Sequence, residues 1–326
     1  PDARPTEGPA FVRSDHDELR LAGLRAWNRW LVDFCREIAP RGAGLAMLPP
    51  LHEVDAVLAE IAEAAAGGLR GVILPDMVPD QPAFHHPMYD PIWNACEEAA
   101  MSLNVHGTTA GPAMFTAAQL GNPTSTADVD PGDVFGDGTL VGALGDGGTG
   151  HRRLMHVFVY GGIFDRFPAL RLAFTEAFVE WVPYERIRLS MPYTDLWYAS
   201  ASKRQLRRTL ARHPDEYWHD HFFFGASFMA PREAALRHDI GVANIMWGSD
   251  YPHPEGTFGV TTESLRNTFA AVPPDELRLM LGETAADFYG FDIAALRPVA
   301  DRVGPTVAAV QTPIDELPTS LTYAFR

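Results

Sequence analysis

The chain has 326 residues, of which 46% are hydrophobic and 21% charged, a composition typical of a globular protein with an apolar core. Its 26 basic and 42 acidic side chains give a net charge of −16, which argues against a surface that binds nucleic acid. The sequence contains no apolar run long enough to span a membrane and no basic start followed by an apolar segment. We therefore expect a cytoplasmic protein with no membrane partner, in which Cys35 and Cys96 are free buried thiols.

The first third of the chain alternates between helical periodicity and short apolar runs. Leu24, Leu31 and Phe34 recur at helical spacing before Pro40, and Gly67-Gly68 is a typical helix stop. The pattern predicts helices at 16–39, 52–66 and 90–100, and strands at 44–48, 71–74 and 103–105.

The rest of the chain begins with a glycine-rich stretch at 121–150, which we expect to be a flexible lid or a partly disordered loop. Beyond it, the pattern predicts helices at 151–164, 178–190, 231–239, 259–271 and 275–288, and strands at 171–175, 222–224 and 244–247. Residues 291–326 contain Pro and Thr and show little periodicity. We therefore expect one domain over residues 1–290, followed by a tail at 291–326 that wraps the domain or a partner subunit.

This alternation of strands and helices predicts an α/β fold with parallel strands joined by helical crossovers. No G-x-G-x-x-G motif follows a strand, so we expect no nucleotide cofactor. The sequence predicts six strands, whereas a closed (β/α)8 barrel has eight.

Three predicted strands end in a side chain that can bind a metal or move a proton, namely His106, Glu176 and Asp250. In a barrel these ends converge on one mouth. Imidazole and carboxylate groups suit Zn²⁺ or a similar divalent ion, and a carboxylate beside the ion can move a proton. Each residue alone could instead be structural, as a hydrogen-bonded core histidine or a turn-capping aspartate. His253, three residues after Asp250, could orient that aspartate or face the substrate.

Several motifs resemble the amidohydrolase-related family, in the branch that includes aminocarboxymuconate-semialdehyde decarboxylase and the resorcylate-type decarboxylases. Gly161-Gly-Ile-Phe-Asp-Arg-Phe-Pro-Ala-Leu-Arg-Leu-Ala-Phe-Thr-Glu176 followed by Trp181-Val-Pro-Tyr-Glu-Arg-Ile is similar to that family, as is Trp247-Gly-Ser-Asp-Tyr-Pro-His253. Trp27-Asn-Arg-Trp-Leu-Val-Asp-Phe34 with Pro40-Arg41 resembles its early helix. The resemblance covers about residues 20–290.

This resemblance implies a distorted (β/α)8 TIM-type barrel with one divalent metal ion, often zinc. It implies that His106 is a metal ligand and that Asp250 is both metal-linked and a proton carrier. Glu176 stands where decarboxylases of the family place a catalytic His, so it could be a base, a ligand or a group that holds a cationic substrate. The family's first strand carries His-x-His, and no such motif precedes residue 100 here. Either further chain precedes Pro1, or the protein has lost that part of the site and its barrel is incomplete at the N-terminus.

The sequence thus predicts a metal-dependent enzyme that acts on a small molecule, with Asp250, Glu176 and His253 as catalytic candidates and His106 and Asp250 as metal ligands. The main expectation is a hydrolase acting on a small carbonyl or carboxylate compound. One alternative is a non-oxidative decarboxylase of an aromatic or unsaturated acid. Another is a metal-free or non-catalytic relative. The family resemblance and the long tail are compatible with a homodimer.

Overall fold

The strands form one parallel sheet in which each strand pairs with the next along the chain. The computed structural model describes residues 17–75, 77, 81–106, 149–194 and 210–325. Its six strands lie in the order β1-β2-β3-β4-β5-β6. They are β1 (Leu45–Met47), β2 (Gly71–Ile73), β3 (Ser102–His106), β4 (Leu172–Ala177), β5 (Phe222–Ser227) and β6 (Ile245–Gly248). The six strands expected from the sequence, and their parallel direction, are therefore confirmed.

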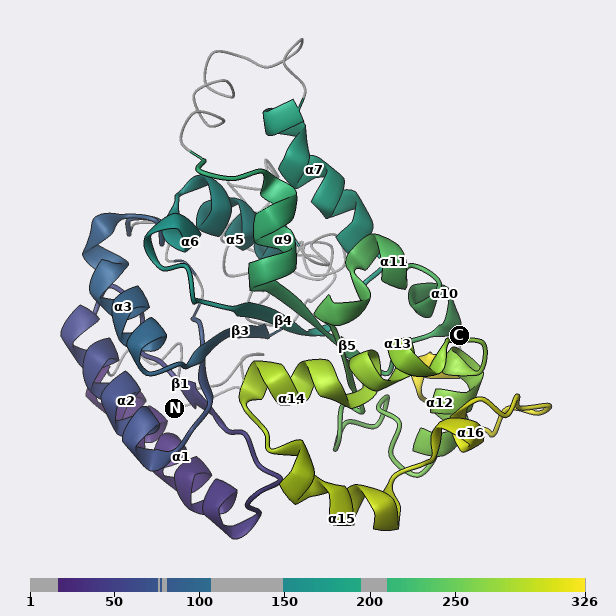
Figure 1. Cartoon of the computed structure of the whole chain (residues 1–326). Helices are drawn as coiled ribbons and strands as arrows, with labels where there is room; N and C mark the ends of the chain where they lie inside the picture. Colours follow the sequence, from purple (N-terminus) through teal and green to yellow (C-terminus); the bar gives the residue numbers. More distant parts are fainter. Residues whose placement is uncertain (1–16, 76, 78–80, 107–148, 195–209, 326) are drawn as a thin grey trace, which may run out of the picture.

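The helices follow one another around this curved sheet (Figure 1). Before the residues at 107–148, which lie outside the described part, come α1 (Asp17–Glu37), α2 (Val54–Gly67), the 3-10 turn η2 (Pro87–Tyr89) and α3 (Asp90–Glu98). After them come α5 (Thr149–Tyr160), α6 (Ile163–Arg166), α7 (Val182–Thr194), α9 (Pro214–His221), α10 (Pro231–Ala234), α11 (Arg237–Ile240) and η4 (Val242–Asn244). The chain continues through α12 (Thr261–Phe269), α13 (Pro274–Arg278), the π-helical turn η5 (Leu279–Glu283), α14 (Thr284–Tyr289), α15 (Ile293–Val303), α16 (Val307–Val310) and η6 (Tyr323–Phe325).

Alternating strand residues build two separate apolar layers, because successive side chains point to opposite faces of a sheet. In β4, Leu172 and Phe174 belong to the large core between the sheet and its helices. Ala173 lies on the other face, in a small cluster with Phe223, Met246 and Phe288. The outer face of the sheet thus holds most of the apolar core.

Helix α14 covers part of the inner face of the sheet. The ring of Phe288 packs on Phe223, with the centroids 4.7 Å apart. The Tyr289 hydroxyl donates a hydrogen bond of 2.9 Å to Oδ1 of Asn104, which is itself buried. Burial raises the pKa of Tyr289, so this hydroxyl remains a donor. These contacts fix the inner layer on which the strand ends stand.

The edge of β1 is closed by a side chain of α1 rather than by another described strand. The Asn28 amide nitrogen donates to the Met47 carbonyl at 3.0 Å, and the Asn28 carbonyl accepts from the Met47 N–H at 2.9 Å. Glu60 of α2 accepts a further bond from the Asn28 amide at 3.2 Å and one from Arg25 at 2.6 Å. Asn28 therefore satisfies both backbone groups that Met47 presents at this edge, as a neighbouring strand would.

Some expected boundaries differ from the structure for local reasons. The helix expected at 151–164 is divided at Gly161-Gly162, where Gly162 adopts a φ of 67°. The helix expected at 178–190 begins at Val182, and the Val179 N–H before it donates to the Glu233 carboxylate at 2.8 Å. The expectation of little periodicity after residue 291 is wrong for Ile293–Val303, which form α15 behind an Asp292 cap.

Two other expectations concern single residues and the membrane. Cys35 and Cys96 are both free, but only Cys96 is buried as expected, and Cys35 is half-buried. Burial raises the pKa of Cys96 to about 12. Among the described residues, no helix combines the length and apolarity that a bilayer crossing requires. The glycine-rich stretch expected to be a lid lies outside the described residues as far as residue 148, and α5 begins directly after it.

We predict that Asn28→Ala lowers the free energy of unfolding by about 2 kcal/mol, because it leaves two backbone groups at the β1 edge and the Glu60 carboxylate without this partner. Chemical denaturation followed by circular dichroism measures this change. Arg36→Ala is the matched control on the same helix, since Arg36 pairs only with Asp33 among described partners and both side chains are exposed; its effect should stay within about 0.5 kcal/mol. Equal effects of the two substitutions would contradict the role given to Asn28.

Candidate functional site

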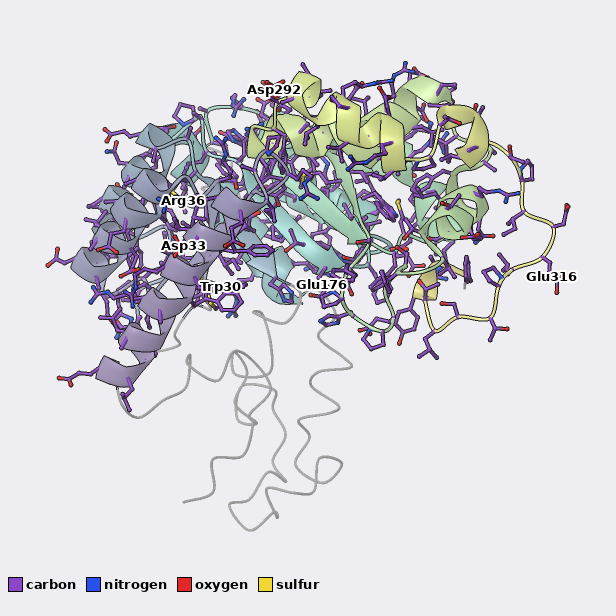
Figure 2. The ribbon with its side chains drawn as sticks, turned by 90° about the horizontal axis from the view of Figure 1, so that it is seen from below. Trp30, Asp33, Arg36, Glu176, Asp292 and Glu316 are labelled. Carbon is purple, nitrogen blue, oxygen red and sulfur yellow. The ribbon has the colours of Figure 1, made fainter. Side chains whose placement is uncertain are left out.

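The side chains singled out in the sequence meet at the carboxyl ends of β3, β4 and β6. His106 is the last residue of β3, Glu176 lies one residue before the end of β4, and Asp250 follows β6 by two residues. Figure 2 shows Glu176 at the end of the strands. Carboxyl ends of parallel strands carry the active sites of α/β barrels. The structure therefore brings together His106, Glu176, Asp250 and His253.

Glu176 occupies a bulge in β4. Thr175 pairs with Gly225 and Ala177 with the next residue, Ala226, so that Glu176 is the extra residue between them. Its φ of 52° lies in the left-handed region, which is costly for a residue with a Cβ atom. A bulge changes the direction of the side chain it carries. This conformation turns the Glu176 carboxylate toward His106, whose Nε2 forms an ion pair with Glu176 Oε2.

Asp250 has a similar backbone conformation, with a φ of 59°. Its carbonyl accepts from the His253 N–H at 2.9 Å, and the Ser249 carbonyl accepts from the Thr257 N–H at 2.9 Å. These bonds close a tight turn after β6. Within the part of the chain that the structure describes, Asp250 Oδ2 is buried and makes no hydrogen bond. A buried carboxylate oxygen without a hydrogen bond is costly unless a cation or a proton compensates it.

The surroundings of Asp250 make its carboxylate easier to protonate than an ordinary aspartate. Burial is the main cause that raises the pKa of Asp250 above its ordinary value, and the negative charge of Glu176 is the second cause. His253 is affected in a related way. Its hydrogen bond to Glu255 and the charge of Asp250 raise the pKa of its imidazole, with Nδ1 lying 3.3 Å from Glu255 Oε1 and 3.8 Å from Asp250 Oδ2. The site therefore combines a carboxyl group and an exposed imidazole whose pKa values are both raised.

Glu176, Asp250 and His253 also form a group with metal-ligand geometry. Each offers one ligand atom, and the three atoms lie within 4.8 Å of one another. Two carboxylates and one imidazole are a suitable donor set for a divalent ion, and the buried Asp250 oxygen without a hydrogen bond fits that occupant. His106, expected as a direct ligand, lies against Glu176 instead, so its role as a ligand stays a prediction. Sequence reasoning missed Glu255, although its place two residues after His253 in an extended turn was a usable signal.

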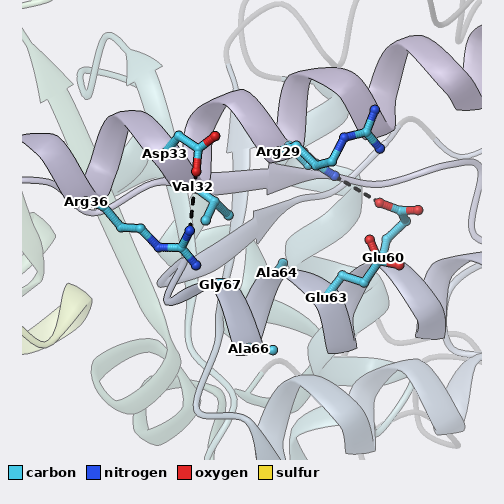
Figure 3. A pocket seen from close by; sticks show the side chains of 10 residues that line it. Arg29, Val32, Asp33, Arg36, Glu60, Glu63, Ala64, Ala66 and Gly67 are labelled. Atoms are coloured by element: carbon cyan, nitrogen blue, oxygen red, sulfur yellow. Dashed lines mark hydrogen bonds and ion pairs between the residues drawn. The ribbon is translucent and has the colours of Figure 1, made fainter.

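A pocket of about 450 Å³ lies elsewhere, between α1 and α2 in the outer layer of helices (Figure 3). Arg29, Asp33 and Arg36 line it from α1, and Glu60 and Glu63 line it from α2. Its rim carries both signs of charge and includes the Asp33–Arg36 pair. This mixture favours neither an anion nor a cation, and the pocket lies away from the strand ends.

We predict that Asp250→Asn stabilises the metal-free protein at neutral pH. The pKa of Asp250 is raised in the folded state. The contribution of this carboxyl group to the free energy of unfolding is therefore fully present below its unfolded-state pKa, and it is lost as the pH rises through its folded-state pKa. The neutral amide does not undergo this loss, so the variant should unfold at higher denaturant than the wild type at pH 7. The difference should vanish below about pH 4.

Denaturation of chelator-treated protein between pH 3.5 and 8 measures this difference. Asp315→Asn, an exposed carboxylate in the C-terminal segment, is the matched control and should follow the wild type at every pH. An Asp250→Asn variant that is less stable than the wild type at pH 7 would contradict the burial argument.

Several solved structures share the fold of this chain. A 5-carboxyvanillate decarboxylase from Sphingomonas paucimobilis is 20% identical, with a TM-score of 0.63 over 86% of this chain and 76% of that one. A 2,6-dihydroxybenzoate decarboxylase from Rhizobium is 20% identical, with a TM-score of 0.62 over 87% of this chain and 82% of that one. A dihydroxybenzoic acid decarboxylase from Polaromonas sp. JS666, with bound manganese and the inhibitor 2-nitroresorcinol, is 16% identical, with a TM-score of 0.63 over 87% and 80%.

At these identities the likeness concerns the fold, which confirms the expected α/β barrel in a distorted form. A search of the curated proteins gives no match. The amidohydrolase family model matches residues 1–291, which is most of the chain and includes all four side chains of the site. The chain therefore belongs to the amidohydrolase family, and the expectation that it is an enzyme is confirmed.

Proposed function

We propose that this protein is a divalent-cation-dependent, non-oxidative decarboxylase of a small aromatic or unsaturated carboxylic acid. The observation that carries the proposal is the group of Glu176, Asp250 and His253 at the strand ends, in which Asp250 Oδ2 is buried and has no hydrogen bond to the described residues. The fold neighbours support the reaction type, since those compared above are named as decarboxylases of aromatic acids.

The donor set supports manganese at least as well as the zinc expected from the sequence. Glu176 and Asp250 provide carboxylate oxygens and His253 an imidazole nitrogen. Carboxylate-rich sites suit harder ions such as Mn²⁺, whereas Zn²⁺ favours sites richer in nitrogen and sulfur. When bound, the ion would offset the two carboxylates and hold the acid group or a neighbouring oxygen of the substrate. His106 would keep Glu176 oriented through their ion pair.

Asp250 is the proton carrier in this proposal. Its carboxylate takes up a proton delivered through His253 and transfers that proton to the substrate carbon that bears the carboxylate. The bond between that carbon and the carboxylate then breaks, its electron pair returns to the unsaturated system, and CO₂ leaves. Asp250 is left ionised and regains a proton from water through His253, which lies beside it and beside Glu255. The overall change replaces CO₂ with a proton, so that no oxidant or reductant is required.

Hydrolysis, the main expectation from the sequence, receives less support than this alternative. The family model is compatible with both reactions, but the similar solved structures described above are carbon–carbon lyases. The two reactions give different products. Decarboxylation releases CO₂ and places one solvent proton on carbon, whereas hydrolysis of an ester or amide breaks the bond next to the carbonyl and divides a water molecule between the two products.

We predict that the manganese-loaded protein releases CO₂ from at least one member of a panel of hydroxybenzoic acids, and that in D₂O one deuteron appears at the vacated carbon. Asp250→Asn should lower the rate of CO₂ release about 1000-fold or more, because it removes both an expected metal ligand and the group that transfers the proton. Headspace CO₂ measurement and NMR of the product follow both quantities. His238→Ala, an exposed histidine on α11, is the control and should retain full activity.

Hydrolysis of ester or amide analogues without CO₂ release from any acid would move the protein to the hydrolase alternative. No turnover of either class by a protein that binds manganese would favour a non-catalytic relative.

A further inference from the structure

Three aromatic rings from distant parts of the chain meet beside the strand ends. The centroids of Phe178 and Phe228 are 5.7 Å apart, those of Phe178 and Tyr323 are 5.8 Å apart, and those of Phe228 and Tyr323 are 5.7 Å apart. Each ring therefore contacts both others, at tilted or edge-on angles that are favourable for aromatic pairs. We call these three residues the aromatic wall.

The aromatic wall adjoins the candidate site through the backbone. Phe178 follows Glu176 by two residues at the end of β4. Phe228 follows β5, and its N–H donates to the Gly248 carbonyl at 2.8 Å, two residues before Asp250. Phe228 also has a left-handed backbone, with a φ of 39°. Three consecutive strand ends, those of β4, β5 and β6, thus carry left-handed residues at Glu176, Phe228 and Asp250, and such strained positions concentrate at functional sites.

Tyr323 reaches this place because the C-terminal segment is anchored on both sides of it. Thr322 and Ala324 are fully buried, and Asn267 of α12 donates to the Ala324 carbonyl at 3.0 Å. The C-terminal end of the chain accordingly lies beside α12 in Figure 1. A ring held between two buried neighbours has little conformational freedom to lose when it binds a ligand.

The loops that carry the two phenylalanines are tied to the same scaffold. The buried Glu233 carboxylate accepts from the Val179 N–H at 2.8 Å and from the Ala230 N–H at 2.9 Å, which joins the segments after β4 and β5. The Thr268 hydroxyl donates to the Met229 carbonyl at 2.7 Å. Adjacent residues of α12 therefore hold both the Phe228 loop and the Tyr323 segment, so that the three rings are fixed relative to one another.

The aromatic wall is nonetheless open to solvent on one side. Phe178 is 44% exposed and Tyr323 is 37% exposed, while Phe228 is only 7% exposed. A rigid cluster of exposed rings beside an active site is typical of a ligand-binding surface. A flat unsaturated ring gains more there than a saturated one, because aromatic pairs interact beyond simple burial of area.

We propose that the aromatic wall binds the ring of a planar aromatic substrate, and that Tyr323 is a specificity-determining residue supplied by the C-terminal segment. Tyr323 lies beyond residues 1–291, the part matched by the family model. The inference rests on the proposed function only for the reaction that follows binding. Ring recognition itself requires neither a metal ion nor turnover.

The test uses chelator-treated full-length protein with two neutral probes, resorcinol and cyclohexane-1,3-diol, which present the same hydroxyl groups on a flat and a saturated ring. NMR titration of each probe gives its Kd. The wild type should bind resorcinol about tenfold more tightly than the diol. Tyr323→Ala and Phe178→Leu should each lose most of this preference, while Tyr323→Phe keeps it. Leu321→Ala, an exposed residue of the same segment, is the matched control and should behave as the wild type.

An equal affinity of the wild type for the two probes would overturn the proposal, as would an undiminished preference in both folded variants, Tyr323→Ala and Phe178→Leu. Circular dichroism establishes that each variant is folded. A preference for the flat ring in a protein that releases no CO₂ would contradict the proposed function and support the proposed role of the aromatic wall. CO₂ release by a wild type that shows no preference for the flat ring would support the proposed function and overturn the proposed role of the aromatic wall.

Discussion

The candidate site depends on the left-handed backbone of three residues, Glu176, Phe228 and Asp250, which lie at or just after the ends of three neighbouring strands. Parallel pairing aligns the ends of β4, β5 and β6, but an extended chain would turn alternate side chains toward opposite faces. The bulge at Glu176 and the turn at Asp250 depart from this alternation. They bring two carboxylates from strands that are not neighbours into one group, with the Phe228 turn on the strand between them.

This arrangement is unfavourable for the metal-free protein, because two carboxylates in a partly buried group repel each other and lose hydration. Three features reduce that cost. His106 pairs with Glu176, the raised pKa of Asp250 makes its carboxylate easier to protonate, and the His253 imidazole lies between Asp250 and Glu255. A bound cation would offset the repulsion and the lost hydration of these two carboxylates, so the site is suited to bind one. The apolar layers, and hydrogen bonds such as that between Asn28 and the edge of β1, stabilise the fold and offset the unfavourable strand ends.

The sequence predicted all six described strands and their parallel direction, because short apolar runs separated by helical periodicity leave few alternatives. It also predicted that His106, Glu176 and Asp250 stand at strand ends. It did not predict the bulge, since a single inserted residue leaves no trace in an apolar pattern. The left-handed conformation that orients Glu176 within the expected group of strand ends was therefore missed. Phe178, Phe228 and Tyr323 come together through hydrogen bonds of Glu233, Asn267 and Thr268. Such side-chain ties over long sequence separations carry no local signal.

If the ends of β4 and β6 together hold a divalent cation, the metal-free protein should bind manganese at this site. Calorimetric titration should give about one ion per chain for the wild type and no measurable binding for Glu176→Gln or Asp250→Asn. His106→Gln should bind 10- to 100-fold more weakly, because the residue acts through Glu176. A folded wild type that binds no ion, or carboxylate variants that bind it as tightly as the wild type, would contradict the account.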